Sequence, residues 1–293
     1  MTFVSNLING ISLGSVYAII ALGYTMVYGI AKMLNFAHGD VIMVGAYISF
    51  CTATYLNLPP VVSVLTAVVV CTVLGILIEG LAYKPLRKAG SLAVLITAIG
   101  VSFFLQNTAL LIWGSAPKVF TTVVPIGSIS LFDGSLIITG ESIITVLACI
   151  VIMVALTFFT KKSRMGKAMR AVSEDKDAAE LMGINVNHTI SMTFAIGSAL
   201  AAIAGVLLCS AYPTLVPTTG SMPGIKAFTA AVFGGIGSIP GAMLGGILLG
   251  IIEIFSKSYI STSLSDAIVF AVLIIVLLVK PTGILGKQIT EKV

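Results

Sequence analysis

The chain has 293 residues, of which 58% are hydrophobic and only 9% charged, and its mean hydropathy is +1.12. Soluble domains carry about 25% charged residues because their surface faces water, so this composition excludes a soluble globular protein and indicates a polytopic membrane protein embedded in the lipid bilayer. The net charge of +5 comes from basic residues between apolar segments, which indicates membrane topology and not nucleic-acid binding.

Apolar segments long enough to cross a membrane, about 20 residues each, recur along the whole chain. They lie near 7–31, 38–58, 61–82, 91–113, 142–160, 189–212, 240–256 and 264–280. A further apolar stretch at 225–236 is too short to span comfortably and predicts a half-helix. The sequence therefore predicts an all-α transmembrane helix bundle of about eight spans, with nine as the alternative, forming a single domain over 1–293.

Lys and Arg residues predict the orientation of these spans. Of the 16, all but Lys118, Lys226 and Lys257 fall on one face of the predicted bundle. That face carries Lys32, Lys84, Arg87, Lys88, Lys161, Lys162, Arg164, Lys167, Arg170, Lys176, Lys280, Lys287 and Lys292. Cytoplasmic loops collect positive charge, so the charged loop 161–188 is expected inside. The loop 114–141 is then extracytoplasmic, and its composition predicts a small hairpin or cap. Counting spans places the N-terminus outside.

The first two spans are separated by a polar interruption near 30–40. It contains Asn35, His38, Gly39 and Asp40. If the interruption lies at membrane depth, these groups must face protein or a water-filled path. A structural tie between two helix ends and a contact with a transported substrate are both open, as is a simple cytoplasmic turn.

A second interruption lies near 225–241. Its candidate residues, in a helix break or a translocation path, are Gly234, Gly235, Gly237 and Ser238. Beyond it, Gly241, Gly245, Gly246 and Gly250 form small-xxx-small pairs that let helix backbones approach closely in lipid. Paired interruptions resemble the broken helices of transporter repeats, and a weak similarity between 23–47 and 227–250 indicates an internal repeat.

Few ionisable residues lie in the predicted spans. Glu79, Lys226, Glu253 and Asp266 fall close to span ends. We therefore expect all of them at the membrane interface.

The cytoplasmic loop contains a short helix with clear ends. Ser173 is predicted to cap its first turn, Glu174 and Asp175 suit the positive end of its dipole, and Gly183 is suited to end it. The candidate docking residues are Ser173, Glu174, Asp175, Asp177, Ala178, Ala179, Glu180, Leu181 and Gly183. A capped helix with an apolar face usually docks onto a partner, which we expect to be a cytoplasmic protein; a solvated linker is the alternative.

Three stretches resemble one family of transporters. Asp177-Ala-Ala-x-x-x-Gly183 resembles the Glu-Ala-Ala-x-x-x-Gly coupling loop of bacterial ABC-importer permeases, with Asp in place of Glu. Leu22–Ile30 with Asn35–Asp40, and Ala231–Ala242, are similar to the N-terminal and C-terminal signatures of branched-chain amino acid ABC permeases. The resemblance covers essentially the whole chain, and it is closest to the shorter of the two permease subunits.

This resemblance implies an importer of leucine, isoleucine or valine in the bacterial inner membrane. It implies a heterodimer with a second, longer permease subunit, two cytoplasmic ATPase subunits and a periplasmic amino-acid-binding protein. The coupling helix would transmit ATP-driven alternating access, with ATP and magnesium used by the partners and no cofactor bound by this chain. A permease of a urea or short-amide ABC importer is the alternative, because it shares these signatures.

Other function classes fit the residues less well. The chain has no phosphate-binding loop, neither of its two histidines has a recognisable catalytic partner, and its four cysteines lie singly in apolar segments. We therefore expect no catalytic residue and no metal site. An ion-coupled secondary amino-acid carrier would normally place ionisable groups inside its spans, and it has no use for a docked cytoplasmic helix.

Overall fold

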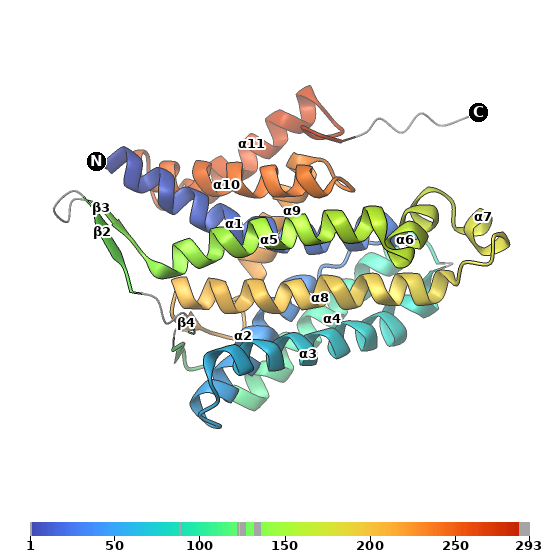
Figure 1. Ribbon diagram of the computed structural model, residues 1–293, viewed down its shortest axis with the longest axis horizontal. Helices are drawn as coiled ribbons and strands as arrows, with labels where there is room; N and C mark the ends of the chain where they lie inside the picture. The colour runs from blue at the N-terminus through green and yellow to red at the C-terminus, as the bar shows by residue number, and fades with distance from the viewer. Residues whose placement is uncertain (1, 88, 122, 124–126, 132–135, 287–293) are drawn as a thin grey trace.

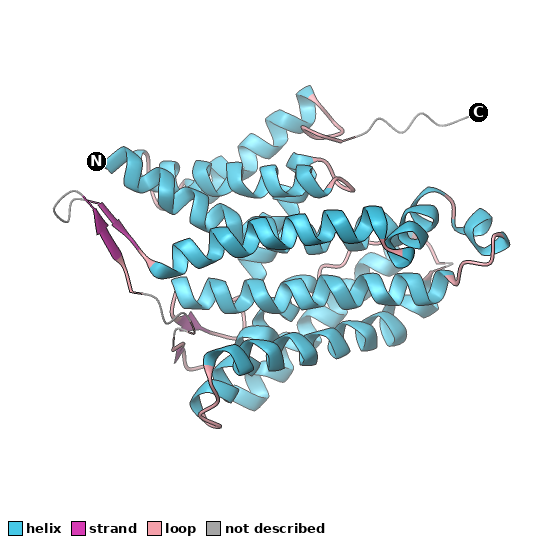
Figure 2. Cartoon of the chain, viewed as in Figure 1, coloured by secondary structure: helices cyan, strands magenta, loops and turns pink. Residues whose placement is uncertain are grey.

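The computed structural model describes residues 2–87, 89–121, 123, 127–131 and 136–286 as a bundle of roughly parallel and antiparallel helices (Figures 1 and 2). Lys88, Lys287 and Lys292, which contributed to the predicted orientation, lie outside the described residues. So does part of the predicted extracytoplasmic hairpin, at 122, 124–126 and 132–135.

Helices occupy all eight predicted spans. They are α1 (Thr2–Ala31), α2 (His38–Thr54), α3 (Pro60–Ile78), α4 (Ser91–Trp113), α5 (Gly140–Lys162), α8 (Val186–Ala211), α10 (Ile239–Tyr259) and α11 (Ser265–Val279). A π-helix, η1 (Glu79–Tyr83), and a 3-10 turn, η2 (Lys84–Leu86), extend α3. The predicted half-helix is α9 (Ser221–Gly234), and the cytoplasmic loop forms α6 (Arg164–Glu174) and α7 (Lys176–Leu181).

Six of the described helices are long and apolar enough to cross a membrane. They are α1, α3 with its extension, α4, α5, α8 and α10. The other two predicted spans, α2 and α11, form shorter helices of 17 and 15 residues. The prediction of an all-α polytopic bundle is confirmed.

The bundle has a protein-facing centre and an apolar outer layer. The apolar windows of α1 and α8 are largely buried, whereas few residues of those of α3, α4 and α5 are buried despite a comparable or higher hydropathy. In water such exposure would be unstable, but lipid tails accept apolar side chains. α1 and α8 therefore form the scaffold on which the helix interruptions are placed.

Glycines set how closely α10 approaches its neighbours. A Cβ on Gly250 would lie 2.2 Å from Gly14 Cα in α1, and a Cβ on Gly246 would lie 2.4 Å from Ala18 N. On another side of α10, a Cβ on Gly245 would lie 2.1 Å from the carbonyl oxygen of Ala230 in α9. The two small-xxx-small pairs thus serve two different helix contacts.

Short strands gather at one end of the bundle. β1 (Lys118–Val119) pairs with β4 (Thr214–Leu215), and β2 (Ile129–Leu131) pairs with β3 (Leu136–Ile138), both antiparallel. The β2–β3 pair confirms the predicted hairpin. Figure 1 shows these strands and the N-terminus at one end and α7 at the other, as the distribution of basic residues predicts for an outer and a cytoplasmic end.

Candidate functional site

The first interruption is a stretch of non-helical chain that is partly buried. α1 ends at Ala31, where Lys32 adopts φ 56°, a left-handed conformation that is uncommon for a residue with a side chain. α2 starts only at His38 and has 17 residues, about 26 Å at 1.5 Å per residue. Residues 32–35 therefore form an irregular connection that leads into a turn at 36–37, with Asn35 and Ala37 buried.

Asn35 ties this connection to the cytoplasmic end of α3. Its Oδ1 accepts a hydrogen bond from Tyr83 Oη at 3.0 Å, and Tyr83 is itself buried at the end of η1. An amide inside a membrane protein must be satisfied by the protein, and this contact does so. It supports the structural role; a contact of Asn35 with substrate stays a prediction.

Asp40 lies in the first turn of α2, where the helix dipole favours a negative charge. It is buried, and its Oδ1 accepts a hydrogen bond from Gln106 Nε2 at 2.9 Å. The same amide nitrogen lies 3.3 Å from the hydroxyl oxygen of Ser221, the first residue of α9. Gln106, from α4, therefore connects the starts of α2 and α9.

His38 and Gly39 pack the start of α2 against α1 and α9. The ring of His38 lies 4.5 Å from the ring of Tyr24, centroid to centroid. A Cβ on Gly23 would lie 2.6 Å from His38 Nε2, so that glycine leaves room for the imidazole. A Cβ on Gly39 would lie 2.7 Å from the carbonyl oxygen of Gly220, next to α9. Both residues thus have packing roles.

The second interruption depends on two glycines. Gly235 has φ 105° and Gly237 has φ 92°, conformations that favour glycine. Ser238 then caps α10, because its hydroxyl oxygen accepts a hydrogen bond from Gly241 N at 3.2 Å. Gly234 has a different role, since a Cβ there would lie 1.9 Å from the carbonyl oxygen of Gly241.

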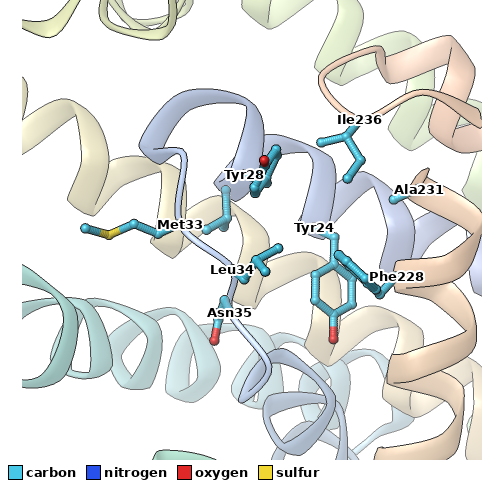
Figure 3. A pocket seen from close by; sticks show the side chains of 9 residues that line it. Tyr24, Tyr28, Met33, Leu34, Asn35, Phe228, Ala231 and Ile236 are labelled. Atoms are coloured by element: carbon cyan, nitrogen blue, oxygen red, sulfur yellow. The ribbon is translucent and has the colours of Figure 1, made fainter. Parts of the chain in front are cut away.

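The structure brings the two interruptions together, which the sequence alone did not predict. A Cβ on Gly29, near the end of α1, would lie 3.3 Å from Gly237 Cα. The ring of Phe228 in α9 lies 5.7 Å from that of Tyr24 in α1 and 5.7 Å from that of Phe36. Figure 3 shows Tyr24 beside Phe228, with Asn35 on the connecting segment.

We call this region the inner junction and define it by the residues that line its cavity. They are Tyr24, Val27, Tyr28, Met33, Leu34, Asn35, Phe228, Ala231 and Ile236 (Figure 3). The cavity measures about 10 Å³, roughly the space of a single water molecule. The two interruptions therefore meet at a packed contact that leaves no room for an amino acid.

The predicted N-cap of the cytoplasmic helix is wrong. Ser173 lies inside α6, and its hydroxyl donates to the carbonyl oxygen of Arg170 at 2.7 Å. α6 continues past Ser173 because its buried Met169 and Val172 pack against the bundle. Glu174 accordingly ends α6 instead of opening the next helix.

Asp175 is the residue that starts α7. It adopts an extended conformation, φ −152° and ψ 119°, and its Oδ1 accepts hydrogen bonds from the backbone nitrogens of Asp177 and Ala178 at 2.9 and 3.0 Å. At the other end Gly183 has φ 83°, and Ile184 N donates to the carbonyl oxygen of Ala179 at 3.0 Å. The predicted glycine terminus is confirmed.

The apolar residues of α7, and of the turn that follows it, differ in their exposure. Ala179 is buried, whereas Leu181 is 90% exposed and Met182 is 82% exposed. Both lie at the end of the bundle opposite the strands (Figure 1). Two large apolar side chains in this position are typical of a surface that a partner covers.

Lys176 connects this helix to the first interruption. Its Nζ donates to the carbonyl oxygen of Ala31, the last residue of α1, at 2.9 Å. Burial lowers the pKa of Lys176 below its usual value, and the nearby charges of Arg87 and Lys32 lower it further. The Ala31 carbonyl therefore holds an ammonium that Arg87 and Lys32 repel.

The four ionisable residues predicted at the membrane interface differ in their burial. Glu79, Lys226 and Glu253 are buried, and only Asp266 is substantially exposed. Glu79 accepts hydrogen bonds from Arg87 and from the hydroxyl of Ser191 in α8. A carboxylate can be buried near a span end when the fold supplies donors, which the sequence did not indicate.

A second buried carboxylate lies near the outer end. Glu253 Oε1 accepts from Lys226 Nζ at 2.8 Å and from Lys257 Nζ at 2.6 Å, and Tyr17 Oη donates to Oε2 at 2.8 Å. Lys226 also pairs with Asp266 at 2.7 Å. The one sequence signal was the spacing of Glu253 and Lys257, which places them on one helix face.

Comparison with known proteins relates the chain to one group of transporters. Residues 6–277 match the family described as branched-chain amino acid transport system, permease component. The high-affinity branched-chain amino acid transport system permease protein LivH of Escherichia coli is 48% identical over 99% of this chain and 98% of that protein. The corresponding protein BraD of Pseudomonas aeruginosa is 46% identical, with the same coverage.

Among solved structures, PsaBC from Streptococcus pneumoniae in complex with Fab covers 94% of this chain and 91% of that chain. The TM-score is 0.49 and the sequence identity 15%. At these values the similarity supports no conclusion about the fold or function of this chain.

Proposed function

The chain belongs to the branched-chain amino acid transport permease family, and we propose from this that it is the shorter permease subunit of an ABC importer for leucine, isoleucine and valine. Near full-length identity of 46% and 48% to proteins named for high-affinity branched-chain transport supports this substrate class over urea or short amides. Family membership also speaks against an ion-coupled secondary carrier.

The proposed assembly contains this chain, a longer permease subunit, two cytoplasmic ATPase subunits and a periplasmic amino-acid-binding protein. It lies in a bacterial inner membrane, with the strand-bearing end outside. ATP and magnesium are used by the ATPase subunits, and this chain binds neither. The exposed Leu181 and Met182 support an ATPase contact at α7.

The family match carries the importer assignment, and the observation that carries its coupling part is the hydrogen bond from Lys176 to Ala31. It joins the helix that would contact the ATPase to the residue at which α1 is interrupted. Movement of α7 therefore reaches the start of the interruption through one direct contact and does not require a chain of intermediates.

In the proposed mechanism the inner junction is the cytoplasmic gate. Its cavity of about 10 Å³ corresponds to a closed gate. Closure of the ATPase dimer on ATP displaces α6 and α7, and Lys176 draws on the end of α1. Backbone hydrogen bonds anchor the segment 32–37 at its two ends, from Lys32 N to the carbonyl oxygen of Tyr28 and from His38 N to that of Asn35. The segment shifts away from Phe228 between the two helices that it joins and opens the junction. Alternating access follows from coupling this shift to the ATP cycle.

The variant Leu181→Asp tests the ATPase contact. The chain is reconstituted with its partners in proteoliposomes, and ATP hydrolysis stimulated by the binding protein is measured together with leucine uptake. Central apolar residues of an interface typically contribute about 2 kcal/mol or more, so we expect both rates to fall about 30-fold.

Leu56→Asp is the matched control, since Leu56 is also exposed but lies in the connection between α2 and α3. We expect it to insert, assemble and transport normally. Normal uptake and normal ATP hydrolysis in Leu181→Asp would show that α7 does not couple the ATPase to transport.

A further inference from the structure

We propose that a polar cavity at the outer end of the chain binds a zwitterionic aliphatic amino acid before it is translocated. This inference rests on the proposed function and deepens it, since it names a place where this chain itself contacts the transported molecule. We call this cavity the outer cavity and define it by the residues that line it: Leu13, Tyr17, Leu208, Tyr212, Thr214, Thr219, Pro223, Glu253 and Lys257.

The outer cavity lies where four helices and β4 converge. α1 lines it from the N-terminal half, α8 and α10 from their C-terminal ends, and α9 from its start. Its volume is about 230 Å³, which is about seven or eight water molecules at ~30 Å³ each. An amino acid of the size of leucine fits such a space, in contrast to the closed inner junction.

Both signs of charge face this space. Glu253 is only 1% exposed, yet it lines the cavity beside Lys257, whose side chain is 35% exposed. Glu253 Oε1 is shared between Lys226 and Lys257, while its Oε2 accepts from Tyr17 alone among the residues that the structure describes. A carboxylate has lone pairs for further donors, and an ammonium has three N–H groups, so both groups have capacity for a ligand.

The positive and negative charges around the outer cavity balance, and this neutrality favours a zwitterionic ligand. Lys226 and Lys257 are matched by Glu253 and by Asp266, the second partner of Lys226. A neutral cluster has no net field to offset the desolvation of an ion with a single charge. A zwitterion presents an ammonium to Glu253 and a carboxylate to Lys257, so that each of its charges finds an opposite partner.

The remaining wall is apolar and suits an aliphatic side chain. Leu13, Leu208 and Pro223 line the cavity alongside the charged residues. Binding sites for small molecules commonly combine such a wall with a few polar groups that fix the orientation. A branched hydrocarbon side chain would be removed from water here, whereas a polar amide or hydroxyl side chain would lose its hydrogen bonds to water.

The position of the cavity fits an entry site. The strand pair of β1 with β4 places the loop 114–141 at its rim, because Thr214 pairs with Val119 and also lines the cavity. This is the end that the distribution of basic residues places outside. An ionic cluster inside a membrane bundle is costly and commonly marks a substrate or ion pathway, and here an open cavity adjoins it.

The experiment measures protection of a cysteine placed at the rim. Thr214→Cys is introduced into the chain, which is reconstituted with its partner subunits in proteoliposomes without binding protein. A membrane-impermeant methanethiosulfonate reagent then labels the outer face. We expect millimolar leucine to slow labelling of this cysteine at least threefold. Labelling of the parent protein gives the background that comes from its own cysteines, Cys51, Cys71, Cys149 and Cys209.

Three controls decide the chemistry. Thr218→Cys is also exposed but does not line the cavity, so leucine should leave its labelling rate unchanged. 4-Methylpentanoate lacks the ammonium of leucine and 3-methylbutylamine lacks the carboxylate, and neither should protect Thr214→Cys. No protection by leucine, or equal protection by either half-molecule, would overturn the proposal.

A charge variant gives an independent readout. In the Thr214→Cys background, Lys257→Gln should raise the leucine concentration needed for half-protection about tenfold, because a charge-assisted hydrogen bond is lost. Lys118→Gln removes an ammonium from β1 at the same end and should not change it. An unchanged concentration in Lys257→Gln would exclude the assigned carboxylate contact.

The same proteoliposomes separate this inference from the proposed function. Binding protein and ATP are added, and leucine uptake is measured. Uptake without protection would remove the outer cavity from the path while leaving the importer assignment intact. Absence of uptake in the parent protein would contradict the importer assignment, whereas the protection results would still decide the binding site.

Discussion

At the scale of single residues, Lys176 makes the contact with the widest consequence. It joins α7 to the end of α1 across 145 residues of sequence. The sequence placed a basic residue in a basic loop and gave no reason to distinguish it from its neighbours. Its role depends on a carbonyl that is free to accept because α1 ends there.

We predict that Lys176→Met uncouples transport from ATP hydrolysis. Loss of a charge-assisted hydrogen bond amounts to about 1.5 kcal/mol, so leucine taken up per ATP hydrolysed should fall about tenfold. Lys176→Arg keeps a cationic donor and should retain most coupling. The two rates are measured together in proteoliposomes.

Lys167→Met is the control for charge removal, since Lys167 is an exposed lysine of α6 in the same loop. It should leave the ratio unchanged. A normal ratio in Lys176→Met, or an equal fall in Lys167→Met, would show that the Ala31 contact does not transmit the motion.

The burial of Glu79 and Glu253 could not be predicted from the sequence. Each stands near the end of an apolar segment, where an interfacial position is the simpler expectation. Their partners come from elsewhere in the chain: Ser191 for Glu79, and Tyr17 and Lys226 for Glu253. The hydrophobic pattern of a segment predicts whether the segment lies in lipid. It does not predict which hydrogen-bond donors from distant parts of the chain reach a given side chain.

At the scale of elements, glycines let α10 pack closely against both α1 and α9. Its glycines were recognisable from their spacing, but the spacing did not say which helix each pair faces. The structure assigns Gly246 and Gly250 to α1 and Gly245 to α9. Because these glycines have no side chain, α10 packs closely between α1 and α9.

We predict that Gly250→Val destabilises the bundle. A Cβ at this position would lie 2.2 Å from the backbone of Gly14, and backbone cannot move aside as a side chain can. Overpacking typically costs about 1–3 kcal/mol, and this contact should reach the upper end. The loss is measured as the fraction of purified complex that survives heating in detergent.

Gly100→Val in α4 is the matched control. A Cβ on Gly100 meets no atom within 4 Å, so its survival curve should follow that of the parent chain. Equal heat resistance of the two variants would mean that the α1–α10 seam does not hold the bundle together.

Helix positions were predictable to a large extent, but the start of the cytoplasmic helix was not. Eight apolar segments became helices because nothing but internal hydrogen bonding can satisfy a backbone in lipid. The cytoplasmic loop lacks that constraint. Its start was assigned to Ser173, yet burial of Met169 and Val172 prolongs α6 and moves the cap to Asp175. Local capping signals cannot anticipate such tertiary packing.

At the scale of the whole molecule, the two cavities differ in a way that suits one stage of transport. The inner junction is closed at about 10 Å³ and the outer cavity is open at about 230 Å³. The helix interruptions were predicted from the sequence, but their meeting was not, because α1 and α9 are separated by most of the chain. Alternating access requires that ATP-driven movement at α7 reverse this difference.

The most direct test of this account is leucine uptake by the complete assembly. The chain is reconstituted with the longer permease, the two ATPases and the binding protein, and the initial rate of labelled leucine accumulation is measured with ATP or a non-hydrolysable analogue. We predict uptake only when binding protein and hydrolysable ATP are both present. Uptake driven by an ion gradient without ATP, or uptake of urea in place of leucine, would contradict it.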